Sequence, residues 1–479
     1  MSNSSNQSKN TFIPIAIIAG LFFIFGFVTW INGALIPFMK TINELTSFQS
    51  LLVASASYIS FVIMALPASY IISKTGYRKG MSLGLIIMAI GALVFIPAAN
   101  ARTYWLFLVA IFIQGMGMTI LQTASNPYIT ILGPIESAAK RIAIMGIANK
   151  VAGALGSLIF AGLLLTGIDD INEKLKLVSV EEKNQILDGM ADSVITPYIV
   201  MAVVLLILGL LIRKAPLPHV EPDPIEESTD GESAKTSIFQ FPHLWLGVLA
   251  LFFYVGAEVI AGDTIIAYGI SLGIPTAEAK FFTMFTLMAM VGTYALGVVL
   301  IPKYLKQDLA LKISAVLGII FTTCIIFTSG FTSVLFVAAL GISNALVWPA
   351  IWPLTLKGLG KFTKSASALL IMAISGGAVL TPLYGRLVDG EKIDLIIQWL
   401  NESVNVTTYL NPYVIENLIT KNRINELAEQ IPTVDFDQVN QIVLTATAEA
   451  STSSYWILYI CYAFILYYAI AGHKVGLKK

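Results

Sequence analysis

The chain has few charged residues, few histidines and almost no cysteine. Only 12% of its 479 residues are charged, against roughly 25% in an average soluble domain. The two cysteines lie inside long apolar runs, which argues against a disulfide scaffold or a cysteine metal site. The three histidines form no H-E-x-x-H pattern, and C-x-x-C and phosphate-loop patterns are also missing. The 29 basic residues offset 29 acidic ones, so no net charge suggests a nucleic-acid partner.

Long apolar runs dominate instead, and 56% of the residues are hydrophobic. A bilayer core about 30 Å thick needs about 20 apolar residues in helical conformation. The sequence predicts twelve such spans, at residues 12–39, 49–72, 81–99, 104–132, 142–166, 195–212, 243–272, 277–301, 309–328, 332–356, 365–387 and 453–472. The first run is too long for a cleaved signal peptide, so we expect it to be a retained helix.

Lysine and arginine lie almost entirely in alternate short loops. One set of loops carries the basic residues at 74–79, 140–141, 213–235, 303–306, 357–364 and 474–479. The opposite short loops hold only Lys40 and Arg102. Because such residues resist translocation, we expect both termini to be cytoplasmic. The membrane itself is expected to be the plasma (inner) membrane.

A polar segment at 213–242 divides the chain. It combines prolines with acidic residues, a composition that does not build a packed core. We expect it to be a cytoplasmic linker between an N-terminal six-helix bundle, 1–212, and a C-terminal bundle, 243–479. A second long segment, the extracytoplasmic insertion 389–452, exceeds the usual length of a structureless loop, so we expect surface helices over the outer mouth.

The two halves echo each other in sequence. Pro127 precedes Gly153 by 26 residues, and Pro349 precedes Gly376 by 27, with basic residues in each interval. Duplicated halves are typical of carriers whose substrate site lies at the pseudo-symmetric interface. The predicted fold is therefore an all-α membrane protein with twelve transmembrane helices in two pseudo-symmetric six-helix bundles.

Charged residues inside the predicted spans each need a partner or a role. Lys150 lies too deep to reach the membrane surface and should meet a carboxylate. The candidates are Glu258 and Asp263, which point to different sides of an ideal helix, although Gly256 and Gly262 allow a break that brings both to one cation. We expect Asp263 to be partly exposed in the outer vestibule. The alternative is a buried ion pair of Lys150 with Glu258 that only fixes helix packing.

Amide and tryptophan side chains in these spans suit an uncharged sugar. Amides offer donors and acceptors in pairs that match sugar hydroxyls, and an indole presents an apolar face to a pyranose ring. The candidate substrate-binding residues are Asn32, Gln122, Asn126, Asn149, Trp30 and Trp348. Hydrogen bonding between helices is the alternative role of each amide.

Several motifs resemble the fucose, galactose and glucose cation-symporter branch of the major facilitator superfamily. The most specific is L-Q-T-A-S-N-P-Y-I-T-I-L-G-P at 121–134, supported by N-G-A-L-I-P at 32–37, F-F-Y-V-G-A-E-V at 252–259 and I-S-G-G-A-V-L-T-P at 374–382. The resemblance covers nearly the whole chain. It implies hexose uptake driven by a proton or sodium gradient, through rocking of two six-helix bundles about a central site.

The resemblance also bears on individual positions. Fucose-permease members carry an aspartate where this chain has Gly33 and a glutamate at the position of Gln122, and their functional asparagine matches Asn149. Glucose and galactose members share the glutamine and carry a glutamate matching Glu258. Because Gly33 and Gln122 cannot ionise, the proton route of the fucose permeases is missing from this chain.

We therefore predict a secondary transporter that imports a hexose or related sugar by cation-coupled symport, with Glu258, Asp263 and Lys150 in coupling. The expected partners are the sugar, a co-transported Na+ or H+ and the lipid bilayer, with no nucleic acid, no resident cofactor and a monomeric state. The open alternatives are an uncoupled facilitator or exchanger, an N-acetylglucosamine transporter and a drug exporter. A membrane enzyme is disfavoured, since no catalytic set of residues is visible in the sequence.

Overall fold

The computed structural model describes residues 4–132, 138–175, 177–218, 237–301, 304–404, 410–420, 424–431 and 436–476. Within these residues every regular element is a helix. Twelve helical segments are long and apolar enough to cross a membrane, which confirms the predicted number of spans. Of the predicted linker, residues 219–236 lie outside the described part, and α10 begins at its last residue, Pro242.

The N-terminal half packs its helices around α5 and α6. Its membrane helices are α1 (Ser4–Trp30) with α2 (Asn32–Ile42), α3 (Ser47–Thr75), α4 (Tyr77–Asn100), α5 (Tyr104–Ile131), α6 (Ala138–Leu164) and α9 (Ile195–Ile212). α5 packs against α3 and α4, whereas α1 packs along α6. The first span is not one continuous helix, because it is interrupted at Ile31 between α1 and α2.

The C-terminal half has more interrupted spans. Its helices are α10 (Pro242–Asp263) with α11 (Ile265–Ser271), α12 (Thr276–Ala279) with α13 (Phe282–Leu300), α14 (Gln307–Phe327), α15 (Gly330–Ala345) with α16 (Val347–Leu356), α17 (Thr363–Met372), α18 (Gly376–Val404) and α22 (Ile457–Ile470). α10 lies at the centre and contacts α15, α16, α18 and α22. The two halves meet where α3 packs on α18 and α6 packs on α13.

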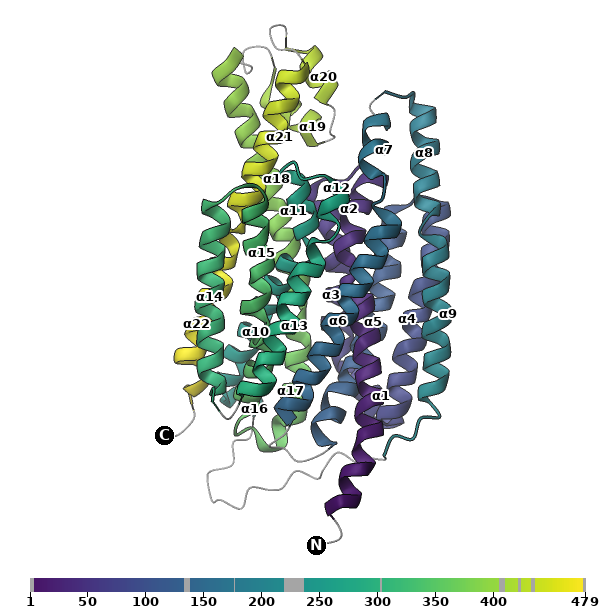
Figure 1. Ribbon diagram of the computed structural model, residues 1–479, viewed down its shortest axis with the longest axis vertical. Helices are drawn as coiled ribbons and strands as arrows, with labels where there is room; N and C mark the ends of the chain where they lie inside the picture. Colours follow the sequence, from purple (N-terminus) through teal and green to yellow (C-terminus); the bar gives the residue numbers. More distant parts are fainter. Residues whose placement is uncertain are drawn as a thin grey trace.

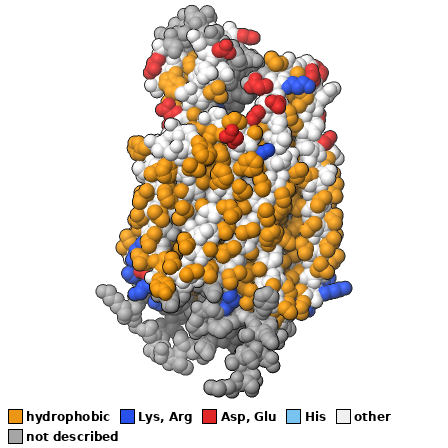
Figure 2. Space-filling view, in the orientation of Figure 1, with side chains coloured by type: hydrophobic (Ala, Val, Ile, Leu, Met, Phe, Trp, Pro, Cys, Tyr) orange, Lys and Arg blue, Asp and Glu red, His pale blue; other side chains and the backbone are white. Residues whose placement is uncertain are grey.

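The molecule has two distinct ends along its long axis (Figure 1). Both termini lie at one end, which we call the termini end. The other, the insertion end, carries α7 (Ile168–Leu175), α8 (Val180–Asp192), α19 (Pro412–Thr420), α20 (Ile424–Glu429) and α21 (Phe436–Ser453). Figure 2 shows an apolar belt between the ends, with lysine and arginine gathered at the termini end and most acidic side chains at the insertion end.

The predicted helices of segment 389–452 are present. α18 does not stop near residue 387 but continues to Val404, and α21 leads through one turn of 3-10 helix into α22. These helices enclose an apolar core of their own, which includes Ile396, Leu400, Ile415, Leu427 and Val439. The insertion packs on α11, α14 and α18, so it stands on the C-terminal half rather than across both halves (Figure 1).

Two glycines allow the closest helix crossings. A Cβ at Gly26 would overlap the carbonyl oxygen of Asn149, where α1 crosses α6. A Cβ at Gly376 would overlap the carbonyl oxygen of Phe252, where α18 crosses α10. The two crossings occupy equivalent places in the two halves, joining the first span to the fifth and the seventh to the eleventh.

Replacing Gly376 should therefore destabilise the fold. We expect Gly376→Val to lower the free energy of unfolding by about 1 to 3 kcal/mol, because α18 must move away from α10. Gly20→Ala is the matched control, since Gly20 is exposed and a Cβ there meets no atom within 4 Å. The check is thermal unfolding of both purified variants; equal melting temperatures would contradict the close-packing role.

Candidate functional site

A cavity of about 110 Å³ lies between the two halves. The N-terminal half contributes its walls from α1, α3, α5 and α6, and the C-terminal half contributes α10, α13 and α16. Of the predicted site residues, those that line the cavity are Trp30, Gln122, Asn126, Asn149, Lys150, Glu258 and Trp348. Asn32 and Asp263 do not. Phe22 and Phe25 also line it, so the cavity extends from Trp30 toward the termini end.

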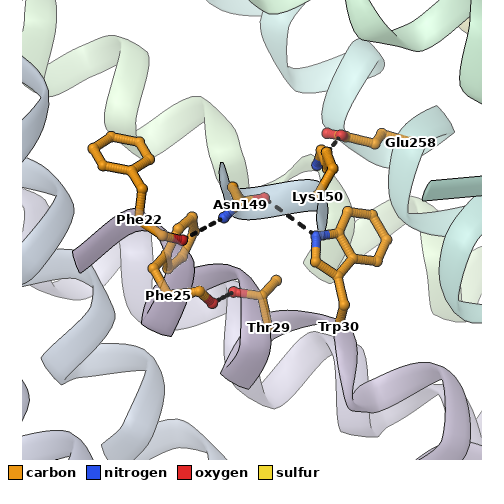
Figure 3. A network of polar contacts seen from close by, with 7 residues as sticks. All are labelled: Phe22, Phe25, Thr29, Trp30, Asn149, Lys150 and Glu258. Carbon is orange, nitrogen blue, oxygen red and sulfur yellow. Dashed lines mark hydrogen bonds and ion pairs between the residues drawn. The ribbon is translucent and has the colours of Figure 1, made fainter. Parts of the chain in front are cut away.

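An ion pair crosses the cavity from one half to the other. Lys150 Nζ on α6 lies 2.6 Å from Glu258 Oε1 on α10, and the two side chains are only 9% and 11% exposed. The predicted contact between them is confirmed. Lys150 Nζ also lies 4.3 Å from the ring centroid of Trp30, a cation–π contact that holds the ammonium group in place (Figure 3).

Asn149, the neighbour of Lys150, is held by two long hydrogen bonds. Its Oδ1 accepts from Trp30 Nε1 at 3.4 Å, and its Nδ2 donates to the carbonyl oxygen of Phe22 at 3.4 Å (Figure 3). Both distances exceed the usual 2.9 to 3.0 Å or so of such bonds. Asn149 therefore does form the hydrogen bonds between helices that were its alternative role. Both bonds are long, so a ligand hydroxyl can replace either of them.

Asp263 departs from the sequence expectation. Its residue surface is fully buried, so the prediction of partial exposure in a vestibule was wrong. α10 runs unbroken through Gly256 and Gly262 and ends at Asp263, with the interruption at Thr264. Gly262 serves close packing, because a Cβ there would overlap the indole of Trp30.

The surroundings of Asp263 leave its charge without a direct partner. Neither carboxylate oxygen has a hydrogen-bond partner among the described residues. Glu258 and Lys150 are nevertheless within electrostatic range of the group. Asn32 lies at the same level of the molecule, at the start of α2, and its buried amide nitrogen also has no partner in the described part of the chain.

Three tyrosines line the cavity that the sequence reading missed: Tyr58 on α3, Tyr254 on α10 and Tyr294 on α13. Tyr254 precedes Glu258 by four residues, so both lie on one face of α10. That spacing is a signal that would have found Tyr254. Tyr58 and Tyr294 come from other helices, and only the packing of those helices brings them to the cavity.

The described residues give the site no metal-binding cluster. Within the described ranges, no group of three or more His, Cys, Asp or Glu side chains is placed to hold a metal ion. The ionisable groups of the site are thus the Lys150–Glu258 pair, the neighbouring Asp263 and the tyrosines. Such an arrangement can bind a neutral polyhydroxylated molecule and exchange a proton or a monovalent cation.

Replacing one partner of the Lys150–Glu258 pair should lower the stability of the protein more than replacing both. We expect Lys150→Met and Glu258→Met each to destabilise the protein by about 3 to 5 kcal/mol, because each leaves a buried charge unpaired. The double variant should recover most of that loss. Melting temperatures of the four proteins form the test, and losses that simply add would show that the pair does not interact.

The sequence of this chain is similar to those of known membrane transporters. Residues 18–382 match the family described as Major Facilitator Superfamily. The chain is 32% identical over 398 residues to the glucose/galactose transporter of Brucella abortus, covering 82% of this chain and 91% of that protein. It is 30% identical over 394 residues to the L-fucose-proton symporter of Escherichia coli, covering 80% and 89%.

A crystal structure of a variant of the Escherichia coli fucose:proton symporter has the same fold, with a TM-score of 0.64 at 24% sequence identity over 96% of this chain and 98% of that one. These matches confirm the resemblance read from the motifs. The chain is therefore an integral membrane transporter, not an enzyme, and it belongs to the Major Facilitator Superfamily.

Proposed function

We propose that this transporter imports a hexose or a closely related sugar by cation-coupled symport, with alternating access to one central site. The observation that carries the proposal is the cavity between the halves, which is lined by amides and crossed by the Lys150–Glu258 pair. Relatives named as glucose/galactose transporter and L-fucose-proton symporter support a sugar substrate.

Sugar hydroxyls bind the amides of Gln122 and Asn126 on α5 and of Asn149 on α6. Trp348 provides the stacking face: it is half-buried, lines the cavity and is itself supported by Trp352, with ring centroids 5.4 Å apart at 26°. The indole of Trp30 is already covered by Lys150 and Gly262. Trp30 therefore contributes an edge to the sugar and mainly positions Lys150.

Coupling acts through the two acids on α10. A proton or cation at Glu258 neutralises it and weakens its bond to Lys150, which loosens a direct link between the halves. A buried carboxylate without a partner is costly in its charged form, so Asp263 is neutralised by a proton or bound cation in this state. Asn32 and Asp263 lie beyond Trp30 on the insertion side, and they join the site when the halves re-pack to open that side.

The membrane orientation follows from charge. Lysine and arginine gather at the termini end of the apolar belt (Figure 2), which supports cytoplasmic termini in an inner membrane. In that orientation the cavity extends toward the cytoplasmic side, and the insertion lies outside the cell. The protein functions as a monomer and carries no resident cofactor.

Transport itself is the first test. In proteoliposomes with sodium and proton gradients imposed separately, we expect one of labelled glucose, galactose, fucose or N-acetylglucosamine to accumulate above its outside concentration under one gradient. Mere equilibration would make the protein a facilitator. No uptake of any of these sugars would contradict the proposed substrate class.

Substitutions at different residues should affect cation coupling and sugar binding separately. We expect Glu258→Gln to abolish gradient-driven accumulation yet retain sugar exchange between equal pools, because the amide cannot be charged. Gln122→Ala should instead raise the half-saturating sugar concentration about tenfold, the effect of losing one hydrogen bond worth about 1.4 kcal/mol, with the accumulation ratio unchanged. Glu278→Gln, at an exposed position of α12, is the matched control. Full accumulation by Glu258→Gln would contradict the coupling role.

A further inference from the structure

Asp389 lies in the middle of α18, where the helix passes from the eleventh span into the insertion, and it accepts hydrogen bonds from the start of α3 in the other half. Its Oδ1 accepts from Ser47 N at 3.1 Å and its Oδ2 from Phe48 N at 2.8 Å, and the residue is only 7% exposed. The first N–H groups of a helix have no partner in the helix itself. At α3, Thr46 and Gln49 form a capping box that satisfies their own two N–H groups. Asp389 supplies acceptors for the two that remain.

Asp169 does the same in the opposite direction. It belongs to α7, directly after the fifth span, and its Oδ2 accepts from Thr276 N at 2.8 Å while its Oδ1 accepts from Thr276 Oγ1 at 2.5 Å. Thr276 begins the eighth span, in the C-terminal half.

The two contacts are related by the pseudo-symmetry of the halves. Asp169 lies in the helix after α6 of the fifth span and binds the start of the eighth span, and Asp389 lies in α18 of the eleventh span and binds the start of the second. Gly385, one turn before Asp389, lets α18 approach closely, since a Cβ there would lie 3.0 Å from Phe48 Cα. Both contacts are at the insertion end, whereas the cavity extends toward the termini end.

We propose that Asp389 and Asp169 form two reciprocal latches that keep the insertion side closed while the cavity faces the termini side. Asp389 binds two backbone N–H groups of the opposite half, and Asp169 binds one backbone N–H and one hydroxyl, so both contacts must release before the halves can rock apart at that end. The proposal goes beyond the proposed function, because it concerns the gate and holds for any substrate.

The gate can be probed without a sugar. Ser55 lies at the contact of α3 with α18, where its hydroxyl donates to the carbonyl oxygen of Ala378 at 2.7 Å. In a chain whose Cys324 and Cys461 are replaced by alanine, Ser55→Cys reports opening through its rate of labelling by a membrane-impermeant maleimide. The reagent is applied to intact cells and, separately, to inside-out vesicles, so that the accessible side is identified independently of the expected orientation.

We expect Asp389→Ala to raise the labelling rate from the insertion side about tenfold, in line with the loss of a helix cap. Asp169→Ala should raise it less, because Asp169 is exposed and water weakens its contact. The two effects should multiply, since the latches are separate. Asp394→Ala and Asp170→Ala, at neighbouring exposed acids, should leave the rate unchanged.

A second variant removes one of the two bonds to Asp389 from the side of α3. Ser47→Pro deletes one N–H at the first position of α3, where proline is well tolerated, and Thr46 has the extended conformation (φ −69°, ψ 169°) that a following proline requires. As a single variant, Ser47→Pro should raise the labelling rate. Combined with Asp389→Ala, it should add little, because the bond is already lost. Labelling rates for Asp389→Ala and Ser47→Pro equal to those of the control variants would overturn the proposal.

Discussion

The Lys150–Glu258 pair is the interaction on which the site depends. It places two opposite charges in a buried position, where each charge is tolerable only because the other is present. The pair also joins α6 to α10, so it is a direct bond between the two halves. Neutralising Glu258 would remove the ion pair that joins the halves at their centre, and the same two side chains border the cavity.

The rest of the site is arranged around this pair. Trp30 covers Lys150 on one side and is held by Asn149, and Gly262 leaves room for the indole on the other. The interruption of the first span at Ile31 follows directly after Trp30. Residues on the termini side of Trp30 line the cavity, whereas Asp263 and Asn32 lie on the insertion side of Trp30 and are buried. Trp30 thus lies between the residues that line the cavity and the buried pair Asn32 and Asp263.

The sequence allowed us to predict those features that follow from the cost of burying a polar or charged side chain. A lysine as deep as Lys150 needs a carboxylate, so a contact with Glu258 or Asp263 could be predicted, as could the number of spans, but the choice of Glu258 needed the structure. The exposure of Asp263 could not be predicted, because a helical wheel gives the direction of a side chain but not the helix that covers it. Asp389 and Asp169 look like ordinary loop acids in the sequence, and only the meeting of the two halves gives them their bonds.

The insertion is joined to the membrane domain by continuous helix rather than by flexible loops. α18 passes from the eleventh span into the insertion without a break, and α21 returns through a single 3-10 turn into α22. The insertion is thereby a rigid extension of the C-terminal half, and its tip must sweep through a larger arc than the helices below it when the halves rock. Its distance to α8, which rises from the N-terminal half, would report the conformational state of the transporter from outside the membrane.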